Sequence, residues 1–245
     1  MNTLLPVTPR LVLVLVLLVL AGAGVSVLGR LGHTRAIVTA SVRAAAQLAA
    51  VSLIIVWAVA RLPAVLLFLL VMYGVAAATA GRRIVRSRAA WWAALPVGAG
   101  TVPVVGLMAV TGTLPMKGIV VIPITGIVLG GCLTATSLAG RRALDELTVR
   151  RGEVEAALSI GLSGREAALE ICRPAAAQAL VPALDQARTV GLVTLPGAFV
   201  GMLLGGADPV HAGAVQLVVL IALIAAEAVA VLVTIELAAR GLFRP

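Results

Sequence analysis

The sequence predicts an all-α polytopic membrane protein, a bundle of about seven transmembrane helices. Hydrophobic residues make up 61% of the 245 positions and charged residues only 12%, so lipid must solvate most of the chain. Apolar runs such as LVLVLVLLVL at 11–20 are long enough to contribute to bilayer-spanning helices. The basic residues fall in short gaps between these runs, where they set topology, so the net charge of +9 does not indicate a nucleic-acid partner.

A window of about 20 residues, the length that a bilayer demands of a helix, locates the individual spans. The predicted spans are 11–29, 36–60, 64–80, 91–111, 117–139, 189–206 and 213–238. A secretory signal peptide is the rival interpretation of the first span, but we expect a retained helix, because the run is long enough to cross. The sixth span is the weakest, since it is short and Pro196 interrupts it, and a broken or re-entrant helix fits it as well.

The distribution of basic residues sets the expected orientation. Alternate gaps between spans contain 15 of the 19 lysines and arginines, the other gaps contain 3, and Arg43 lies inside a span. The positive-inside rule then places the N-terminus outside and the C-terminus in the cytoplasm, in the inner or plasma membrane of the cell. Without the sixth span, the C-terminus would lie on the other side. The one long polar interval, about 140–188, is expected to be cytoplasmic.

Residues 153–174, EVEAALSIGLSGREAALEICRP, form a charged, helix-forming stretch within this interval. A helix from about residue 152 would carry an apolar stripe made of Val154, Ala157, Leu158, Gly161 and Leu162. Either the groove of a partner protein or the lipid headgroups could cover such a stripe, and periodicity favours neither. Ser163 and Glu166 have the S-x-x-E spacing of a capping box, which predicts a turn and a second helix.

The spacing within this stretch resembles the EAA loop of ABC-transporter permeases, E-A-A-x3-G-x9-I-x-L-P. The matching positions are Glu155, Ala156, Ala157, Gly161, Ile171 and Pro174, and Leu158 lies on the same stripe. Arg173 departs from the pattern, because the family has Leu there. The resemblance implies a cytoplasmic coupling helix between the fifth and sixth spans, which binds in a cleft of a separate ATPase subunit. ATP and Mg would then belong to that partner, and no cofactor to this chain.

Three other segments resemble the iron-export ABC permeases of the FetB type, whose plant relatives are associated with aluminium tolerance. The segments are SVRAAAQLAAV at 41–51, VIPITGIVLGG at 121–131 and DQARTVGLVTLPGAFVG at 185–201. The resemblance implies one transmembrane permease domain over 1–245, working as a pair with two ATPase copies and exporting iron or another metal. Gly131 stands where we expect Asn, and Ala198 and Phe199 stand where we expect methionines, which leaves the substrate open.

Polar side chains within or next to the spans are the candidates for a translocation path, because a charge at a helix centre costs about 2.5–3.5 kcal/mol. Arg43 and Gln47 lie one turn apart in the second span, and Glu227 lies near the middle of the last. For Arg43 and Glu227, a buried structural pair and a role in the path are equally open. Asp185 precedes the sixth span, three residues from Arg188; these two could pair with each other, which favours a structural role for Asp185.

Close helix packing is expected where glycines recur every four residues. This spacing occurs at Gly126 and Gly130 and again at Gly197, Gly201 and Gly205. Such ridges let two helices approach closely, so we interpret them as packing surfaces and not as sites.

No catalytic site is expected in this chain. A P-loop needs a lysine that reaches phosphates, and the only lysine, Lys117, is predicted in an outer loop. His33 and His211 are predicted on opposite sides of the membrane, and Cys132 and Cys172 have no zinc-site spacing, so both should be free thiols and no metal site is expected.

Two other classes of function compete with an ABC permease. An ion-coupled secondary transporter could use Glu227 as its coupling group and would need no ATPase. A membrane anchor or scaffold is the third possibility, but it would leave the glycine ridges and the charges within the spans without a purpose.

Overall fold

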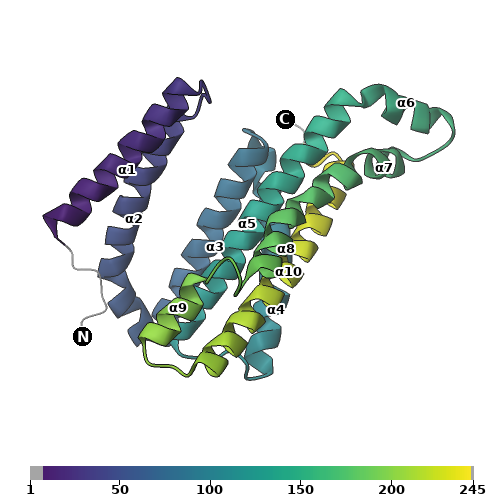
Figure 1. Cartoon of the computed structure of the whole chain (residues 1–245). Coiled ribbons are helices and arrows are strands. Elements are labelled where there is room, and N and C mark those ends of the chain that lie inside the picture. Colours follow the sequence, from purple (N-terminus) through teal and green to yellow (C-terminus); the bar gives the residue numbers. More distant parts are fainter. Residues whose placement is uncertain (1–7, 244–245) are drawn as a thin grey trace. The chain divides into compact units, whose positions relative to one another are not determined.

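The computed structural model describes residues 8–243, and their regular elements are helices (Figure 1). The all-α prediction is therefore confirmed. The chain folds as two compact units, residues 1–58 and 59–245, each described by itself below. The prediction of a single permease domain over 1–245 stays a prediction. Arg244, which contributed to the predicted charge distribution, lies outside the described residues.

Within the described residues, six helical segments are long and apolar enough to cross a membrane. They are α1 (Pro9–Leu28), α2 (Thr34–Ala60), α3 (Leu62–Ile84), the 3₁₀ helix η1 (Arg88–Ala93) continued by α4 (Ala94–Val110), α5 (Gly118–Val149) and α10 (Pro209–Ala239). These correspond to six of the seven predicted spans. The helix α5 is longer than its predicted span and continues about ten residues beyond position 139.

The first unit is a hairpin of α1 and α2. Arg30 and Gly32 both have positive φ, 50° and 71°, in the turn that joins the two helices. Ser26 of α1 is buried, and its hydroxyl accepts a hydrogen bond from Thr34 at 3.3 Å. Most leucines and valines of α1 are exposed, as suits a helix that is apolar all round and lies in lipid.

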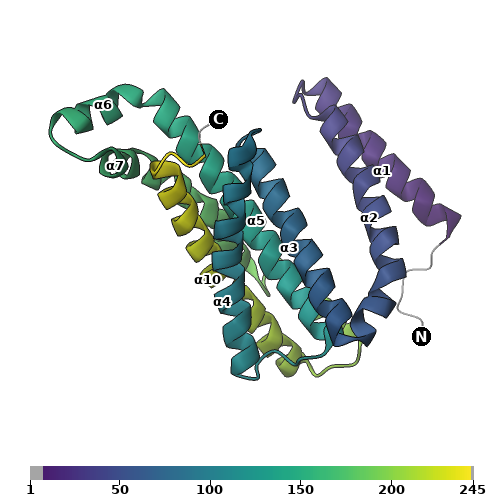
Figure 2. The ribbon, with the colours of Figure 1, turned by 180° about the vertical axis from the view of Figure 1, so that it is seen from behind.

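The second unit is built around α5 and α10, with α3 and α4 packed against them (Figure 2). The side chains buried between these helices are mostly small: Ala76, Ala80, Val97, Val128, Ala135, Ala139, Ala226 and Ala230. Small side chains let helix backbones approach closely, which is the main source of packing energy between helices in lipid.

The predicted span at 189–206 is not a continuous helix, so the seven-span count is wrong for the described residues. Its N-terminal end belongs to α8 (Val181–Thr189), and α9 (Gly197–Leu204) has only eight residues. Between them, Gly191 has a φ of +83°, and three successive amides donate to the carbonyl of Thr189. Pro196 then lacks the N–H that a continuing helix needs.

This broken segment nevertheless returns the chain to the far end of the second unit. Phe199 of α9 lies next to Gly213, near the N-terminal end of α10. At the other end, Arg165 of α7 (Gly164–Ala177) forms an ion pair with Glu236, near the C-terminal end of α10. Figure 1 shows α8 and α9 beside α10. The C-terminal end of α10 therefore lies at the same end of this unit as α7.

The predicted glycine ridge at 197–205 is not a packing surface among the described residues. A Cβ added to Gly197 or Gly201 would meet nothing within 4 Å, and one added to Gly205 would meet only its own preceding turn. In the second ridge, Gly126 is closely approached, by Met72 of α3, whereas Gly130 is not. The close approaches that do occur involve other glycines, described below.

Candidate functional site

The predicted coupling stretch forms a hairpin of two helices, α6 (Arg151–Ser159) and α7, which we call the α6–α7 hairpin. None of the residues of α6 is buried. Glu155, Ala156 and Leu158 are exposed, and Ala157 is half-buried. Val149 and Ile160, at the two ends of α6, are 83% and 79% exposed, so apolar side chains face outward at both ends of this helix.

The turn of the hairpin depends on Gly161. The amide of Gly161 donates to the carbonyl of Leu158 at 3.1 Å, and the amide of Leu162 donates to the carbonyl of Ala157 at 3.2 Å, which is the Schellman pattern. Gly161 has a φ of +98°, a conformation that side chains disfavour. The predicted stripe is thus wrong at its C-terminal end, because α6 stops at Ser159 and Gly161 lies in the turn.

The helix α7 begins at the predicted capping box, which is confirmed. The hydroxyl of Ser163 accepts from the amide of Glu166 at 3.3 Å, and the carboxylate of Glu166 accepts from the amide of Ser163 at 2.9 Å. The Ser163 hydroxyl also donates to the Glu166 carboxylate at 2.6 Å, and this hydrogen bond, followed by the one from the Ser163 amide, lowers the pKa of the Glu166 carboxyl below its ordinary value. Of the residues that match the EAA pattern, Ile171 is buried in the bundle and Pro174 lies exposed within the helix.

An ion pair connects the start of α7 to α10. Arg165 donates two hydrogen bonds to the Glu236 carboxylate, at 2.6 and 2.7 Å, in a bidentate arrangement. This pairing raises the pKa of Arg165. Arg240, one turn beyond Glu236 on the same helix, donates to the same carboxylate at 2.6 Å. The α6–α7 hairpin is therefore attached by charge to one of the two central helices.

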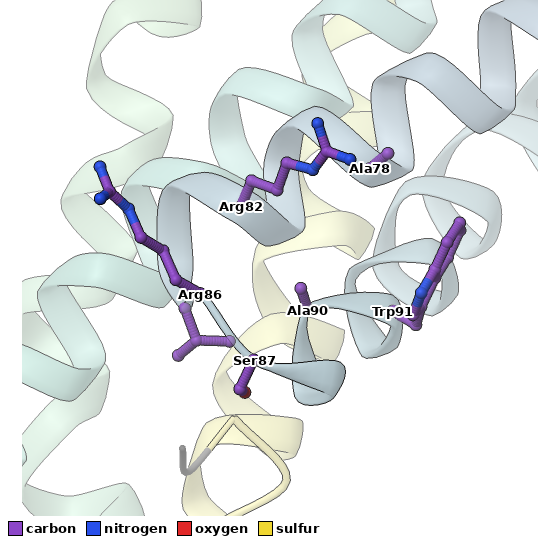
Figure 3. A pocket seen from close by; sticks show the side chains of 7 residues that line it. Ala78, Arg82, Arg86, Ser87, Ala90 and Trp91 are labelled. Carbon is purple, nitrogen blue, oxygen red and sulfur yellow. The ribbon is translucent and has the colours of Figure 1, made fainter.

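A cavity of about 550 Å³ lies where α3 ends and η1 begins. Figure 3 shows Arg82 and Arg86 on the α3 side of this cavity and Trp91 on the η1 side. Ile84, between the two arginines in sequence, packs against Gly140 in the C-terminal half of α5, so this cavity lies toward the hairpin end. Exposed arginines with a tryptophan are typical of a membrane interface.

The four candidates for a translocation path lie in different environments. Arg43 and Gln47 are both exposed on α2, in the first unit. Asp185 pairs with Arg188 at 3.2 Å, as predicted, and both side chains are exposed. Glu227 alone is buried, with 7% of its surface exposed, and no hydrogen bond or ion pair to its carboxylate is present among the described residues.

Glu227 lies in a close contact of helices that the sequence did not indicate. Its carboxylate faces Gly131 of α5, where an added Cβ would lie 2.5 Å from the Oε1 atom. In a second close contact, between α4 and α5, a Cβ added to Gly100 of α4 would lie 2.8 Å from the Cys132 Sγ atom of α5. Cys132 and Thr101 are both buried and were not among the predicted path residues. Cys172 is also buried, and both cysteines are free, as predicted.

The fold and these features define a polytopic α-helical membrane protein with an exposed helical hairpin at one end of its bundle. The chain belongs to the UPF0014 family. The model of that family, described as "Uncharacterised protein family (UPF0014)", matches residues 9–243. This match covers all of the elements described above.

Individual relatives agree with that assignment. The chain is 34% identical over 203 residues to "UPF0014 membrane protein STAR2" of Oryza sativa subsp. japonica, covering 82% of this chain and 71% of the relative. It is 35% identical over 166 residues to "Protein ALUMINUM SENSITIVE 3" of Arabidopsis thaliana, covering 67% and 61%. It is 29% identical over 150 residues to "Probable iron export permease protein FetB" of Escherichia coli K12, covering 61% and 57%. Among solved structures, none matches the chain.

Proposed function

We propose that this chain is the membrane-spanning permease subunit of an ABC transporter that exports iron or another metal, driven by a separate ATPase subunit. The observation that carries the proposal is the contrast within the α6–α7 hairpin. The helix α6 has no buried residue, whereas six residues of α7 are buried in the bundle. A helix held at the end of a bundle and left uncovered is suited to bind in the groove of a partner.

The surface of α6 supports a protein partner. Glu155 pairs with Arg151 on the same helix at 2.9 Å, and Arg150 likewise pairs with Glu153, so the charges of α6 are partly matched within the helix. The exposed apolar side chains of Leu158 and Ile160 lie at the end of α6 next to the turn. Such side chains gain free energy when a partner removes them from water, at about 25 cal/mol per Å².

The attachment of α7 supports transmission of movement from the ATPase to the membrane helices. If the ATPase shifts α6, then α7 must follow, because the hairpin turn is short and tightly hydrogen-bonded. The bidentate contact between Arg165 and Glu236 passes this displacement to the C-terminal end of α10. Ile171 and Cys172, buried farther along α7, connect the same helix to the core.

Metal as the substrate is supported by the name of the relative from Escherichia coli, a probable iron export permease. ATP and Mg would be bound by the ATPase, and this chain would contribute no cofactor. Because ABC ATPases hydrolyse ATP between two copies and each chain has one hairpin, the permease should work as a pair of identical chains surrounded by lipid.

The orientation that this proposal requires places the hairpin in the cytoplasm. Single cysteines at Ser159, exposed on α6, and at Thr113, exposed between α4 and α5, test it, since both native cysteines are buried. A membrane-impermeant thiol reagent added to intact cells should label position 113 and not position 159. Labelling of position 159 would contradict the orientation.

The decisive experiment is co-purification of the chain with its candidate ATPase, followed by measurement of ATP hydrolysis with and without Fe²⁺. The proposal expects a complex of two permease and two ATPase chains whose ATP hydrolysis is stimulated by metal. It also expects that Glu155→Lys, which reverses a charge on the exposed helix, no longer associates with the ATPase. Association of Glu155→Lys at the wild-type level, with normal transport, would overturn it.

An ion-coupled secondary transporter is the second candidate, and one observation favours it. Glu227 is buried in α10 with no ionic partner among the described residues, as a proton- or ion-coupling carboxylate would be. The two candidates differ in one measurement. Metal export that continues in vesicles lacking the ATPase, and that Glu227→Gln abolishes, would favour the secondary transporter.

A further inference from the structure

Three helices of the second unit, α4, α5 and α10, pack closely at Gly100 and Gly131, and a side chain that metals bind lies against each glycine. A Cβ added to Gly131 of α5 would lie 2.3 Å from the Leu223 Cδ1 atom and 2.5 Å from the Glu227 Oε1 atom of α10, so the missing side chain makes room for both. A Cβ added to Gly100 of α4 would lie 2.4 Å from the Ala226 carbonyl oxygen of α10 and 2.8 Å from the Cys132 Sγ atom of α5, so the missing side chain makes room for both. Residues 131 and 132 are consecutive on α5, and Ala226, whose carbonyl faces Gly100, directly precedes Glu227 on α10, so the two contacts lie at the same level of the three helices.

The polar groups at this meeting point are buried and short of partners. Glu227, Thr101 and Cys132 are 7%, 5% and 0% exposed. The Thr101 hydroxyl lies beside the Cys132 thiol, and Glu227 is close enough to interact with that thiol. Among the described residues, neither the Thr101 hydroxyl nor the Glu227 carboxylate has a hydrogen bond of standard geometry. Buried polar atoms without partners cost about 1–3 kcal/mol each, so each of them needs an explanation.

The three helices offer no counter-charge nearby. The helix α4 contains no ionisable residue. On α5, the ionisable residues other than Cys132 begin at Arg141, ten positions beyond Gly131. On α10, the nearest ionisable residue to Glu227 is Glu236, nine positions away and bound to Arg165. Any positive charge that pairs with an ionised Glu227 carboxylate would therefore come from outside these three helices.

We propose that Glu227, Cys132 and Thr101 form a transient binding site for a divalent transition-metal cation on its way across the membrane. The Cys132 thiol would release its proton to solvent as the metal binds. The resulting thiolate and the Glu227 carboxylate together neutralise a charge of +2, which allows the cation to occupy an apolar region, and the hydroxyl adds a neutral oxygen ligand. The thiolate makes the site softer than one built from oxygens, so it selects Fe²⁺, Co²⁺ or Zn²⁺ over Mg²⁺.

The composition of the site suits a substrate more than a resident metal. Within the part of the chain that the structure describes, no three His, Cys, Asp or Glu side chains gather as a resident metal site requires. Two charged ligands and one hydroxyl bind more weakly, and a transported ion must leave as well as enter. The inference rests on the proposed function, because it assumes that a metal crosses this bundle.

Binding of Co²⁺ to the purified full-length chain tests the site, because cobalt bound to a thiolate has a near-ultraviolet charge-transfer band that oxygen ligands do not produce. The chain has only two cysteines. In Cys172→Ser, any such band must come from Cys132, so this variant alone decides whether Cys132 binds the metal. We expect the band in the wild-type chain and in Cys172→Ser, its loss in Cys132→Ser, and its persistence in excess Mg²⁺.

The other two ligands are tested by affinity. Glu227→Gln should weaken cobalt binding by at least about tenfold, since loss of even an outer-shell partner weakens metal affinity by about 10–100-fold. Thr101→Val should weaken it less, because the hydroxyl is uncharged. Gly131→Ala should weaken it without changing any ligand, by displacing the Glu227 carboxylate.

Two results would overturn the inference: no thiolate band in Cys172→Ser with cobalt raised to millimolar concentration, or an unchanged affinity in Glu227→Gln. Neither depends on ATPase binding. A chain that associates with its ATPase and exports metal, but shows no band, would exclude this site and leave the proposed function intact. A chain that shows the band but binds no ATPase would exclude the proposed function and leave this site intact.

Discussion

The two helices of the α6–α7 hairpin are neighbours in sequence and differ in nearly every physical respect. The helix α6 has no buried residue, and Leu158 and Ile160 face outward at its C-terminal end. The helix α7 starts with a capping box, buries Leu169 and Ile171 in the bundle, and is bound to α10 through Arg165. One helix is thus available to a partner, and the other belongs to the core.

This difference shows how one hairpin can satisfy two requirements. A docking helix must leave its surface free, so its own packing cannot hold it in place. A transmitting helix must move together with the bundle, so it needs packing and charge contacts with the membrane helices. The short turn at Gly161 joins the two roles, and a change on each side of that turn should therefore fail in a different way.

The largest expected effect comes from placing a charge on each helix in turn. Leu169→Asp buries an unpaired carboxylate in the core and should remove several kcal/mol of stability, so little folded protein should be recovered. Leu158→Asp, on the exposed helix, should change stability by less than about 0.5 kcal/mol but weaken ATPase association by about tenfold or more. Thermal unfolding and co-purification measure the two effects. The contrast fails if Leu158→Asp unfolds the chain.

The second prediction concerns the turn itself. Gly161→Ala must adopt a φ of +98°, which costs about 1–2 kcal/mol, although a Cβ there meets nothing. If docking requires this turn, ATPase affinity should fall by about 5–30-fold, the equivalent of that free energy. Gly152→Ala, in the helix α6 and equally free of neighbours, is the matched control and should bind normally. Equal affinities for the two variants would show that the turn is dispensable.

The third prediction separates docking from transmission. Arg165→Leu removes the ion pair between α7 and α10, whereas Arg240→Leu removes a hydrogen bond to the same Glu236 from the residue that follows α10. We expect both variants to bind the ATPase and to lose no more than about 1 kcal/mol of stability, because these side chains are largely exposed. Only Arg165→Leu should reduce metal export per ATP hydrolysed. If the two variants export the same amount of metal per ATP hydrolysed, the ion pair between Arg165 and Glu236 does not transmit movement from the ATPase.

Much of the fold could be predicted from local patterns in the sequence. Six apolar runs became the six long helical segments, and the S-x-x-E spacing at Ser163 became a capping box. Both features depend only on residues close together in the chain. The break at 190–196 was harder to predict. It depends on the left-handed conformation of Gly191 as well as on Pro196.

The contacts between distant residues could not be predicted in this way. Arg165 and Glu236 are separated by 71 positions, and neither has a sequence feature that points to the other. Gly100 and Gly131 are close to other helices and belong to neither repeating glycine ridge, while Gly197 and Gly201 have the repeat and no neighbour. Which side of a helix faces its neighbour depends on how the whole bundle packs, and spacing alone does not contain that information.

The smallest expected effect concerns the cap that separates the exposed helix from the core helix. The pKa of Glu166 is lowered in the folded chain by its hydrogen bonds to Ser163, so the stabilisation from the charged cap is present at neutral pH and is lost as the pH falls through this lowered value. Glu166→Gln keeps a capping side chain but no charge. The melting temperature of the wild-type chain should thus exceed that of Glu166→Gln by a small margin at neutral pH, and the margin should shrink on acidification.

Glu170→Gln, exposed on the same helix and outside the cap, controls for the loss of a carboxylate. If it shows the same shrinking margin, the effect comes from net charge, and the cap does not set the boundary between the two helices.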